Sequence, residues 1–519
     1  MKNRDLQATW AYHDGTKHSS ESIRTNRHYL DWENQPIPFK IYSELEPISI
    51  PQHLSSPGMT ALEAISTSES PTKDQCVPSI QTLAEILYLS AGVTKRRSYP
   101  GGEILFRAAA CTGALYHIDL YLVCGDLPGL KAGVYHFGPQ DFAVRRLRDG
   151  DYRDALVQAS GREPAIANAP AIIVCASTYW RNAWKYQSRA YRHCYWDTGT
   201  ILANLLAAAA ARRMPARIVL GFIDGTVSRL LSLDTTREGA LALLALGDAP
   251  SQANGSSARV DPLTFETAPL SKTEVDYPAI RAMHEASSLE GAAEVADWRG
   301  QVSVDVSPIT ERPTPISNDR LTALQQLGDS EIPRDTLEEV IQRRGSTRQF
   351  ARESISFGQL STMLDRATRG VPTDFLRPEE APLNDLYLIV HAVDDLCPGA
   401  YVFYQDSRAL ELLKVGDFRR EAGYLGLGQE IPADCSVDVF FLTDLTRVLE
   451  RWGNRGYRAA QLEASIMGGK LYLAAYAQGL GASGLTFFDD DVTEFFSPHA
   501  AGKSVMFLLA LGKSVKRRI

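Results

Sequence analysis

Residues 454–484 read NRGYRAAQLEASIMGGKLYLAAYAQGLGASG. Ala, Leu, Met and Gln, which favour helices, fill most of this stretch. Gly479 and Gly481 follow, and glycine commonly ends a helix because it adopts the left-handed conformation there. The segment therefore predicts one long, mostly apolar helix that runs into a glycine-rich loop.

A second version of this segment occurs upstream, where residues 188–218 read SRAYRHCYWDTGTILANLLAAAAARRMPARI. The matching positions are 266 residues apart: Arg189 and Arg455, Tyr191 and Tyr457, Asp197 and Glu463, Ala211 and Ala477, Leu120 and Leu386, Tyr121 and Tyr387, Gly133 and Gly399, and Asp224 and Asp490. A register held over so long a stretch means that one folding unit occurs twice. Two copies of this length are two domains, so we predict a tandem duplication.

Composition narrows the class of protein. The chain has 519 residues, 22% charged and 44% apolar, which is ordinary for a globular protein. Its net charge of −8 and the lack of a basic, aromatic stripe argue against nucleic-acid binding. The longest apolar run, about residues 201–211, is shorter than the ~20 residues of a membrane span. The N-terminus lacks the apolar core of a signal peptide. We therefore expect no membrane association.

The cysteines and histidines carry no metal-binding pattern. The seven cysteines are scattered, without paired spacing, which is typical of reduced thiols in a cytoplasmic protein. Cys194 is expected to be a packed thiol. His13 and His18, with Asp14, fit a polar arm better than a metal site. Residues 489–491, all Asp, are expected to form an exposed loop that caps the next helix.

We divide the chain into four parts. Residues 1–78 form an N-terminal arm whose aromatic residues suggest that it packs across the domains. Residues 79–249 and 331–519 are the two copies, and residues 250–330 are a linker with room for a helix. Short β-branched segments alternate irregularly with helices, so each copy is expected to be an α+β domain, a mixed sheet flanked by helices.

The two copies differ in a complementary way. The second has a cationic RRGSTR segment at 343–348, the glycine loop at 479–484 and a basic C-terminus, all suited to holding an anion. The first has Arg213 and Pro215 in place of Gly479 and Gly481, although it keeps KRRS at 95–98. It has in turn a small-residue segment, CTGALY at 111–116, against the bulky RPEE at 377–380. We therefore predict one composite site per chain, with its clamp from the second copy and its small turn from the first.

RRGSTR, the late GLGASG loop and the basic tail resemble FMN-dependent oxidoreductases of the nitroreductase fold. FRAAACTGALYHIDLYLV, GVYHF, the helix beginning SRAYRH, and YHDGTKHS and LDWENQPIPFKIY near the N-terminus resemble the SagB/ThcOx-type dehydrogenase branch in particular. In that fold two subunits share the flavin at their interface. The resemblance implies that the tandem copies form an intramolecular pseudo-dimer in place of the homodimer.

The resemblance also implies residue roles. It places the FMN phosphate at Arg343, Arg344, and Arg517 or Lys513, and it places Ser346 and Arg348 near the isoalloxazine or ribityl chain. Gly481, Ala482 and Ser483 would face the pyrimidine side. Thr112 and Gly113 would come from the other half, where the family has Ser at the position of Cys111, which leaves the hydrogen bond at that position unassigned.

Azoline dehydrogenases of this branch carry a Lys-Tyr pair before the long helix, which is Lys185-Tyr186 here; the second copy has Arg451-Trp452 instead. Azoline oxidation needs a base. Lys and Tyr, with ordinary pKa values of ~10.4 and ~10, serve only if these fall. We expect burial beside cations, with Arg189 and Arg192 nearby, to lower both. A surface pair at a helix start is the alternative interpretation.

Three functions remain open from the sequence. The first is an FMN-dependent dehydrogenase that passes hydride through flavin N5 and oxidises peptide azolines to azoles. The second is an NAD(P)H-dependent nitro or quinone reductase. The third is a non-catalytic flavin- or peptide-binding module. The expected ligands are thus FMN and a small-molecule or peptide substrate, with NAD(P)H as a reductant in the second case, and the sequence leaves further oligomerisation open.

Overall fold

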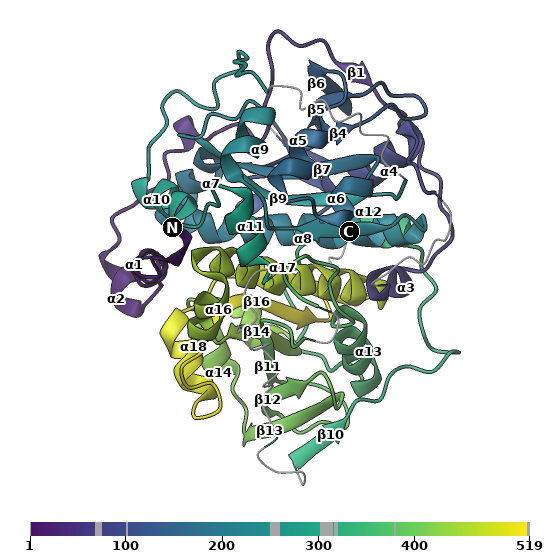
Figure 1. The fold of residues 1–519 in the computed structure, drawn as a ribbon. Coiled ribbons are helices and arrows are strands. Elements are labelled where there is room, and N and C mark those ends of the chain that lie inside the picture. The colour runs from purple at the N-terminus through teal and green to yellow at the C-terminus, as the bar shows by residue number, and fades with distance from the viewer. Residues whose placement is uncertain are drawn as a thin grey trace.

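The structure is a computed structural model that describes residues 2–67, 75–99, 102–249, 260–300, 315, 320–377 and 380–515. Two sheets, one in each copy, enclose a central layer of helices (Figure 1). The sheet of the first copy, called the upper copy from here on, has the order β1-β6-β5-β4-β7-β9-β8. The sheet of the second, lower copy has the order β10-β13-β12-β11-β14-β16-β15, so the two have the same topology. The predicted duplication and α+β class are confirmed.

The upper copy contains β1 (Ile48–Ser49), α3 (Ala61–Ser66), α4 (Ile80–Ala91), β4 (Ile118–Cys124), β5 (Gly133–Gly138), β6 (Ala143–Asp149), α5 (Arg153–Ala159), α6 (Pro164–Asn168), β7 (Ala171–Thr178), α7 (Tyr179–Tyr186), α8 (Ala190–Ala211), β8 (Ala216–Val219), α9 (Asp224–Leu230) and β9 (Glu238–Leu246). The hairpin β2 (Val93–Tyr99) and β3 (Gly102–Arg107) projects from it.

The lower copy contains β10 (Leu321–Ala323), α12 (Leu337–Arg343), α13 (Phe357–Ala367), β11 (Asp385–Val390), β12 (Gly399–Tyr404), β13 (Ala409–Val415), α14 (Arg419–Leu425), α15 (Glu430–Asp434), β14 (Val437–Thr443), α16 (Leu445–Trp452), α17 (Asn454–Ala477), β15 (Gly481–Leu485), α18 (Asp489–Phe496) and β16 (Ser504–Gly512). Outside the two copies lie α1 (Gln7–Gly15), α2 (Ser20–Thr25), α10 (Pro278–Ala286) and α11 (Ala292–Trp298).

Every strand pairing within the two seven-stranded sheets is antiparallel, whereas a mixed sheet was expected. The reason is the position of β9, which lies between β7 and β8 and runs opposite to both. The strands β7 and β8 therefore run in the same direction but never pair, and β16 separates β14 from β15 in the same way.

The central strands are apolar on both faces because each sheet is covered on both sides. Alternate side chains of a strand point to opposite faces. Leu122 of β4 and Ile173 of β7 belong to the core that holds the long helices, whereas Val123 and Val174 pack with residues of α5, α6 and α9. Continuous apolar strands of this kind are typical of a sheet between two layers.

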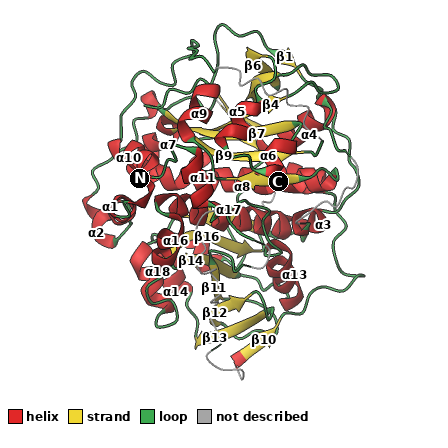
Figure 2. Ribbon diagram, viewed as in Figure 1, coloured by secondary structure: helices red, strands yellow, loops and turns green. Residues whose placement is uncertain are grey.

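The two long helices, α8 and α17, pack against each other between the sheets (Figure 2). A side chain at Gly199 would collide with Ser465, and one at Gly469 would collide with Ala203. Each of these contacts joins positions that are 266 residues apart, so equivalent residues meet across a pseudo-two-fold axis, as in an isologous dimer. The predicted intramolecular pseudo-dimer is confirmed, and small residues set how closely its halves approach.

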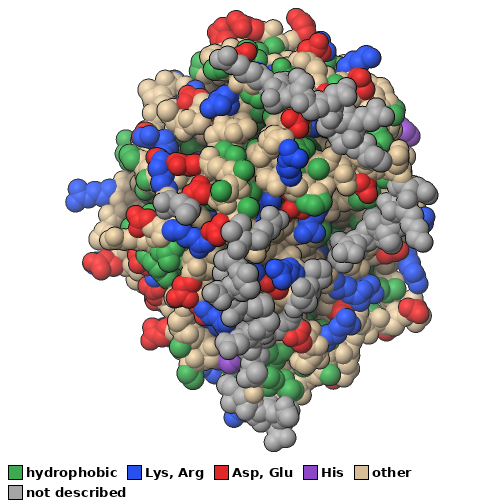
Figure 3. Space-filling view, viewed as in Figure 1, with side chains coloured by type: hydrophobic (Ala, Val, Ile, Leu, Met, Phe, Trp, Pro, Cys, Tyr) green, Lys and Arg blue, Asp and Glu red, His purple; other side chains and the backbone are tan. Residues whose placement is uncertain are grey.

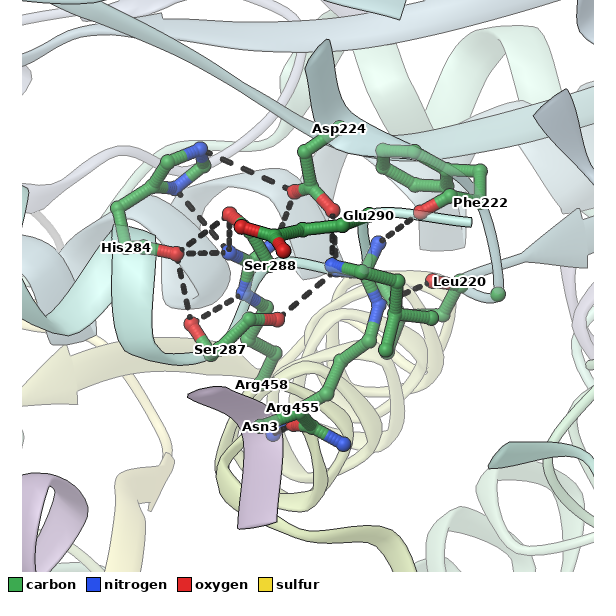
Figure 4. Close-up of polar contacts among 12 residues, drawn as sticks. Asn3, Leu220, Phe222, Asp224, His284, Ser287, Ser288, Glu290, Arg455 and Arg458 are labelled. Carbon is green, nitrogen blue, oxygen red and sulfur yellow. Dashed lines mark hydrogen bonds and ion pairs between the residues drawn. The ribbon is translucent and has the colours of Figure 1, made fainter. Parts of the chain in front are cut away.

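Two crossed ion-pair clusters tie the halves together. The first residues of α8, with Arg189 before it, hold an aspartate of the lower copy, and the first turns of α17 hold an aspartate of the upper copy (Figure 4). The pairs are Arg189–Asp489 at 2.9 Å, Arg192–Asp489 at 2.5 Å, Arg455–Asp224 at 2.7 Å and Arg458–Asp224 at 2.7 Å, and all six side chains are buried.

Comparison of the two clusters corrects the register that the sequence predicts for their aspartates. Asp224 was matched to Asp490, but the residue that performs its role is Asp489, which is 265 residues away. The chain between the long helix and the next one is one residue shorter in the lower copy, and the 266-residue register returns at β9 and β16. For the same reason Asp489 is buried instead of exposed, although it does begin α18 as expected.

The N-terminal arm and the linker are more structured than the sequence suggested. The arm is helical in part, and α1 lies against the lower copy, where Thr9 Oγ1 donates to Asn454 Oδ1 at 2.6 Å. It also supplies β1, which pairs with β6, and α3, which packs against both long helices. The linker holds two helices, α10 and α11, and ends in β10, which pairs with β13. Both segments thus contribute elements to the copies.

The surface is that of a mixed-charge protein. On the face shown in Figure 3, Lys and Arg side chains are interspersed with Asp and Glu. Within the described ranges, none of the helices combines the length and the apolar character that a bilayer crossing requires.

The crossed clusters predict a large difference between two neighbouring aspartates. Asp489→Asn leaves two buried arginines without their carboxylate, so it should lower the free energy of unfolding by about 3–5 kcal/mol. Asp490→Asn removes only a pair with Lys17 from a side chain that is 78% exposed, so it should cost less than about 1 kcal/mol. Urea denaturation of both variants measures this, and equal destabilisation would contradict the corrected register.

Candidate active site

Three separate segments of the lower copy meet at one edge of its sheet. The chain after α12, which contains the RRGSTR motif, runs beside β15 and the end of β16. The Thr347 amide donates to the Ala482 carbonyl at 2.9 Å, and the Ala351 amide donates to the Lys513 carbonyl at 2.9 Å. The arginine motif, the glycine loop and the C-terminal segment therefore form one continuous patch, as the composite site requires.

Gly481 has a packing role at this junction. A Cβ atom there would collide with the hydroxyls of Thr347 and Ser514, which hydrogen-bond to each other at 2.9 Å. Only glycine lets the arginine motif approach β15 this closely. Gly479 ends α17 with φ of 70°, which confirms the predicted helix stop.

Arg344 joins this patch to the upper copy. Its Nε donates to the Ala108 carbonyl at 2.7 Å and its Nη2 to the Arg107 carbonyl at 2.9 Å. The side chain is 8% exposed and also lies over the ring of Tyr472. The arginine motif of one copy is thereby fixed against the segment of the other copy that leads into the small turn.

The small turn at 111–116 is held by one buried carboxylate. Asp197 of α8 accepts from the Thr112 amide at 2.9 Å, from the Thr112 hydroxyl at 2.7 Å and from the Cys111 thiol at 2.9 Å. It also contacts His117 Nε2 at 2.9 Å. Burial and the nearby carboxylate raise the pKa of Cys111, so the thiol stays protonated and donates. Cys111 thus makes a hydrogen bond of the kind that a serine would make.

Lys185 and Tyr186, at the end of α7, lie against this turn. The Tyr186 hydroxyl is so close to Gly113 that a Cβ there would be 2.9 Å from it, and Gly113 has φ of 63°. The Lys185 amine lies 5.4 Å from the centre of the Tyr186 ring. The predicted pair and the predicted turn are therefore neighbours.

The two members of this pair shift in opposite directions. Burial, and then the positive charge of Arg348 from the other copy, lower the pKa of Lys185. Burial, with Asp197 and Cys111, raises the pKa of Tyr186, so the expectation that both would fall is wrong for the tyrosine. Desolvation disfavours whichever form is charged, which is the phenolate of Tyr and the ammonium of Lys. The expected cations, Arg189 and Arg192, are instead bound to Asp489.

Several polar groups of β15 and its surroundings have no hydrogen-bond partner among the residues that the structure describes. The hydroxyls of Ser483 and Thr486 are buried and make no hydrogen bond with any described residue. Arg348 is exposed and forms no hydrogen bond or ion pair within the described part of the chain. Unpaired buried hydroxyls are uncommon, and these two lie in β15 and directly after it. Thr486 was not predicted, because a lone threonine in LTFF carries no sequence signal.

Some predicted residues do not point into this site. Arg343 pairs with Asp335 at 2.5 Å and donates to the Tyr476 carbonyl. Lys513 pairs with Glu353 at 3.5 Å. Residues 95–98, the supposed remnant clamp of the upper copy, lie on the projecting β2 strand and are largely exposed. Arg517, with the rest of 516–519, lies outside the described residues.

The pseudo-symmetric position at the other end of the interface is different. It contains a cavity of about 680 Å³ lined by both copies. Pro215, Ala216 and Arg217 line it. Ala216 pairs with Leu246 of β9 as Gly481 pairs with Gly512 of β16, so Ala216, and not Pro215 as expected, takes the position of Gly481. Glu463, the counterpart of Asp197, also lines it, and burial raises the pKa of this carboxyl to about 7. This position therefore lacks the glycine that lets the arginine motif approach β15 in the lower copy, as expected for the site without a clamp.

One group of potential metal ligands lies in the lower copy. The ligand atoms of His391, Cys435 and Asp438 are within 4.8 Å of one another, and all three residues are buried. Burial raises the pKa of Asp438, whose Oδ2 contacts His391 Nε2 at 3.1 Å, while His391 Nδ1 and Asp438 Oδ1 have no partner among the described residues. That the chain needs no metal stays a prediction.

Comparison with known proteins gives the family. The model of the Nitroreductase family matches residues 116–248 and 341–513, one segment in each copy and together more than half of the chain. The crystal structure of a nitroreductase-like protein from Anabaena variabilis is 26% identical, with a TM-score of 0.75, and the match covers 98% of this chain and 99% of that one.

Two curated relatives have described roles. Trifolitoxin-processing protein TfxB of Rhizobium leguminosarum bv. trifolii is 27% identical over 188 residues, 35% of this chain and 50% of TfxB. Microcin B17-processing protein McbC of Escherichia coli is 24% identical over 226 residues, 40% of this chain and 79% of McbC. The chain thus spans about half the length of TfxB. With a family match in each half and a duplicated sheet-and-helix fold, the chain belongs to the nitroreductase family of oxidoreductases.

Proposed function

We propose that the chain is an FMN-dependent oxidoreductase of the SagB type, with one flavin held between its two copies. The observation that carries the proposal is the convergence of the arginine motif, β15 and the small turn of the other copy on one place. Each feature alone is a common one. Their meeting, with buried hydroxyls left unpaired beside them, fits a nucleotide-like ligand that has both a phosphate and a polar ring.

The residues present suggest how FMN would be held. Arg348, an exposed cation with no hydrogen bond or ion pair to any described residue, would be available for the phosphate or ribityl chain, and Ser346 lies in the same segment. The hydroxyls of Ser483 and Thr486 would face the polar edge of the ring. Arg344 would not contact FMN directly, because it donates to carbonyls of the other copy and so positions the arginine motif. When bound, FMN supplies a ring that accepts hydride.

We infer that the substrate is a peptide azoline. TfxB and McbC are named as processing proteins of trifolitoxin and microcin B17, and this chain carries the Lys-Tyr pair expected of azoline dehydrogenases in one copy only. Oxidation of an azoline to an azole removes a hydride and a proton from neighbouring atoms of the ring. The Lys185 amine, whose pKa is lowered, takes the proton at Nζ. The raised pKa of Tyr186 keeps its hydroxyl protonated, so it would donate a hydrogen bond to the substrate.

Purified protein is expected to be yellow and to release FMN on denaturation. Arg348→Ala should weaken FMN binding by roughly tenfold or more, since it removes a charge-assisted hydrogen bond. Arg343→Ala is the matched control in the same segment, and it should leave the affinity within about twofold because Arg343 is paired with Asp335. Fluorescence titration of the apoprotein with FMN measures both constants. Protein that ignores added FMN, or equal losses in the two variants, would refute the assignment.

Lys185→Ala should lower the rate of azoline oxidation by roughly 10²–10⁴-fold while FMN stays bound, since a general base contributes that much. The control is Arg451→Ala, the equivalent position of the lower copy, where the side chain pairs with Glu380 at 2.6 Å. Oxidation of a synthetic thiazoline peptide is followed by mass spectrometry. If Lys185→Ala oxidises it as fast as the parent, the base is elsewhere.

Reduction of the bound flavin distinguishes the other functions. Rapid anaerobic reduction by NADH or NADPH, together with unaltered nitro or quinone reduction in Lys185→Ala, identifies an NAD(P)H-dependent reductase. Bound FMN that neither a pyridine nucleotide nor an azoline peptide reduces identifies a binding module instead.

A further inference from the structure

The two crossed clusters are equivalent in position but not in hydrogen bonding. In the upper cluster every nitrogen of the Arg455 guanidinium donates a hydrogen bond. Its Nε donates to the Leu220 carbonyl at 2.6 Å, its Nη2 to the Phe222 carbonyl at 3.3 Å, and its Nη1 to Asp224 at 2.7 Å and to the Ser287 carbonyl at 3.0 Å. Figure 4 shows this arginine turned into that set of acceptors.

Arg189, its counterpart, uses only one nitrogen. Nη1 donates to Asp489 at 2.9 Å and to the Thr16 carbonyl at 2.6 Å. Nε and Nη2 are buried and find no acceptor among the described residues, although the side chain is only 4% exposed. Leu485, the last residue of β15, and Phe487, just after it, occupy the positions of Leu220 and Phe222, yet their carbonyls accept no hydrogen bond from Arg189. The arginine fork is therefore open on one side.

The buried cluster at Arg189 has more positive than negative charge. Arg189 and Arg192 share the single carboxylate of Asp489. In the upper cluster, where two arginines likewise share Asp224, backbone carbonyls and hydroxyls complete both forks. A buried guanidinium with free donors is costly unless an anion or another acceptor joins it. The asymmetry therefore leaves a buried guanidinium whose Nε and Nη2 have no acceptor in the described part of the chain.

Aromatic rings frame this position. The Arg189 guanidinium lies 5.3 Å from the ring centre of Phe487 and 5.9 Å from that of Trp196. His193 lies 4.7 Å from Trp196, centre to centre, and its buried Nε2 has no partner within the described ranges. The same ring meets the edge of Tyr186 at 4.5 Å. A continuous row of rings thus leads from Arg189 to the Lys185-Tyr186 pair.

The N-terminal arm closes the outer side. The carbonyl of Thr16 binds Arg189, and the amide of His18 donates to Asp489 at 2.8 Å. Further along, Trp184 Nε1 on α7 donates to the Asp31 carbonyl at 3.0 Å. The arm therefore lies over the helix that carries Lys185, and it shields the open fork of Arg189 from water. Exclusion of water strengthens an ion pair formed there.

We propose that Arg189 binds a carboxylate of the substrate, with the rings of Phe487 and Trp196 against the apolar part of the same molecule. The inference rests on the proposed function in one respect, namely that this position adjoins the proton-accepting pair. For a planar carboxylate, Nε and Nη2 form the two parallel donors of a bidentate contact. Arg189 is a binding residue in this account, and Arg455 is its structural equivalent without a ligand.

Benzoate is the probe, because it joins a carboxylate to a flat ring, and benzamide is its neutral analogue. Calorimetry on the full chain as purified should show benzoate binding at least tenfold more tightly than benzamide. Arg189→Lys keeps the charge beside Asp489 but loses the fork, so it should abolish this preference. Arg455→Lys is the matched control and should leave it within twofold. No preference for benzoate in the parent protein, or equal effects of the two variants, would overturn the proposal.

A second measurement needs no variant. Phenylglyoxal, which modifies arginine, should label Arg189 in the parent protein, and benzoate should protect it; Arg455, fully bonded, should stay unlabelled. Peptide mapping by mass spectrometry reads both sites. Labelling of Arg189 that benzoate does not prevent, or no labelling at all, contradicts the proposal. If colourless protein that takes up no FMN binds benzoate, the flavin assignment alone is wrong. If flavin-loaded protein does not bind benzoate more tightly than benzamide, this inference alone is wrong.

Discussion

The crossed arginine–aspartate clusters are the constraint on which the rest of the structure depends. Each copy uses the start of its long helix to hold an aspartate that begins a short helix of the other copy. Four buried cations share two buried carboxylates, so neither half can leave without exposing or stranding charge. The pairs also fix the orientation of α8 on α17, and the small residues at the crossing then set the distance.

That fixed orientation is what makes one composite site out of two domains. The arginine motif belongs to the lower copy and the small turn to the upper one, and Arg344 can reach the carbonyls of Arg107 and Ala108 only because the halves are held in place. A homodimer would build the same site twice. Here one position has Gly481, which lets the arginine motif lie close to β15. The other position has a cavity lined by Pro215 and Arg217. Duplication within one chain allowed the two positions to diverge separately.

The same divergence reaches the clusters themselves. Backbone carbonyls accept from Arg455, whereas Nε and Nη2 of Arg189, beside aromatic rings, have no acceptor among the residues described. The arginine at the start of α17 therefore serves assembly alone. Under the proposal above, its equivalent before α8 would also bind a ligand, next to Lys185 and Tyr186. Such reuse needs no new element, since it requires only that two carbonyls turn away from one arginine.

The duplication, the long helices and the α+β class could be predicted from sequence because each leaves a repeated or periodic signal. The register at Asp224 could not, because a one-residue deletion and its later compensation leave the flanking matches intact. The RRGSTR and GLGASG motifs were found, but Arg343 and Arg344 look alike in sequence, and only the position of Asp335 turns one of them away. The expectation for Tyr186 was wrong because burial raises the pKa of a phenol, and because Arg189 and Arg192 are bound to Asp489.

The central claim is that two unequal halves complete a single flavin site. The amount of FMN released per chain by denaturation of fully reconstituted protein tests it most directly, with protein measured by amino-acid analysis and flavin by absorbance. The account predicts one FMN per chain. Two per chain would show that the opposite cavity also binds flavin, and none would show that the meeting of the two copies serves another ligand; either result would contradict the account.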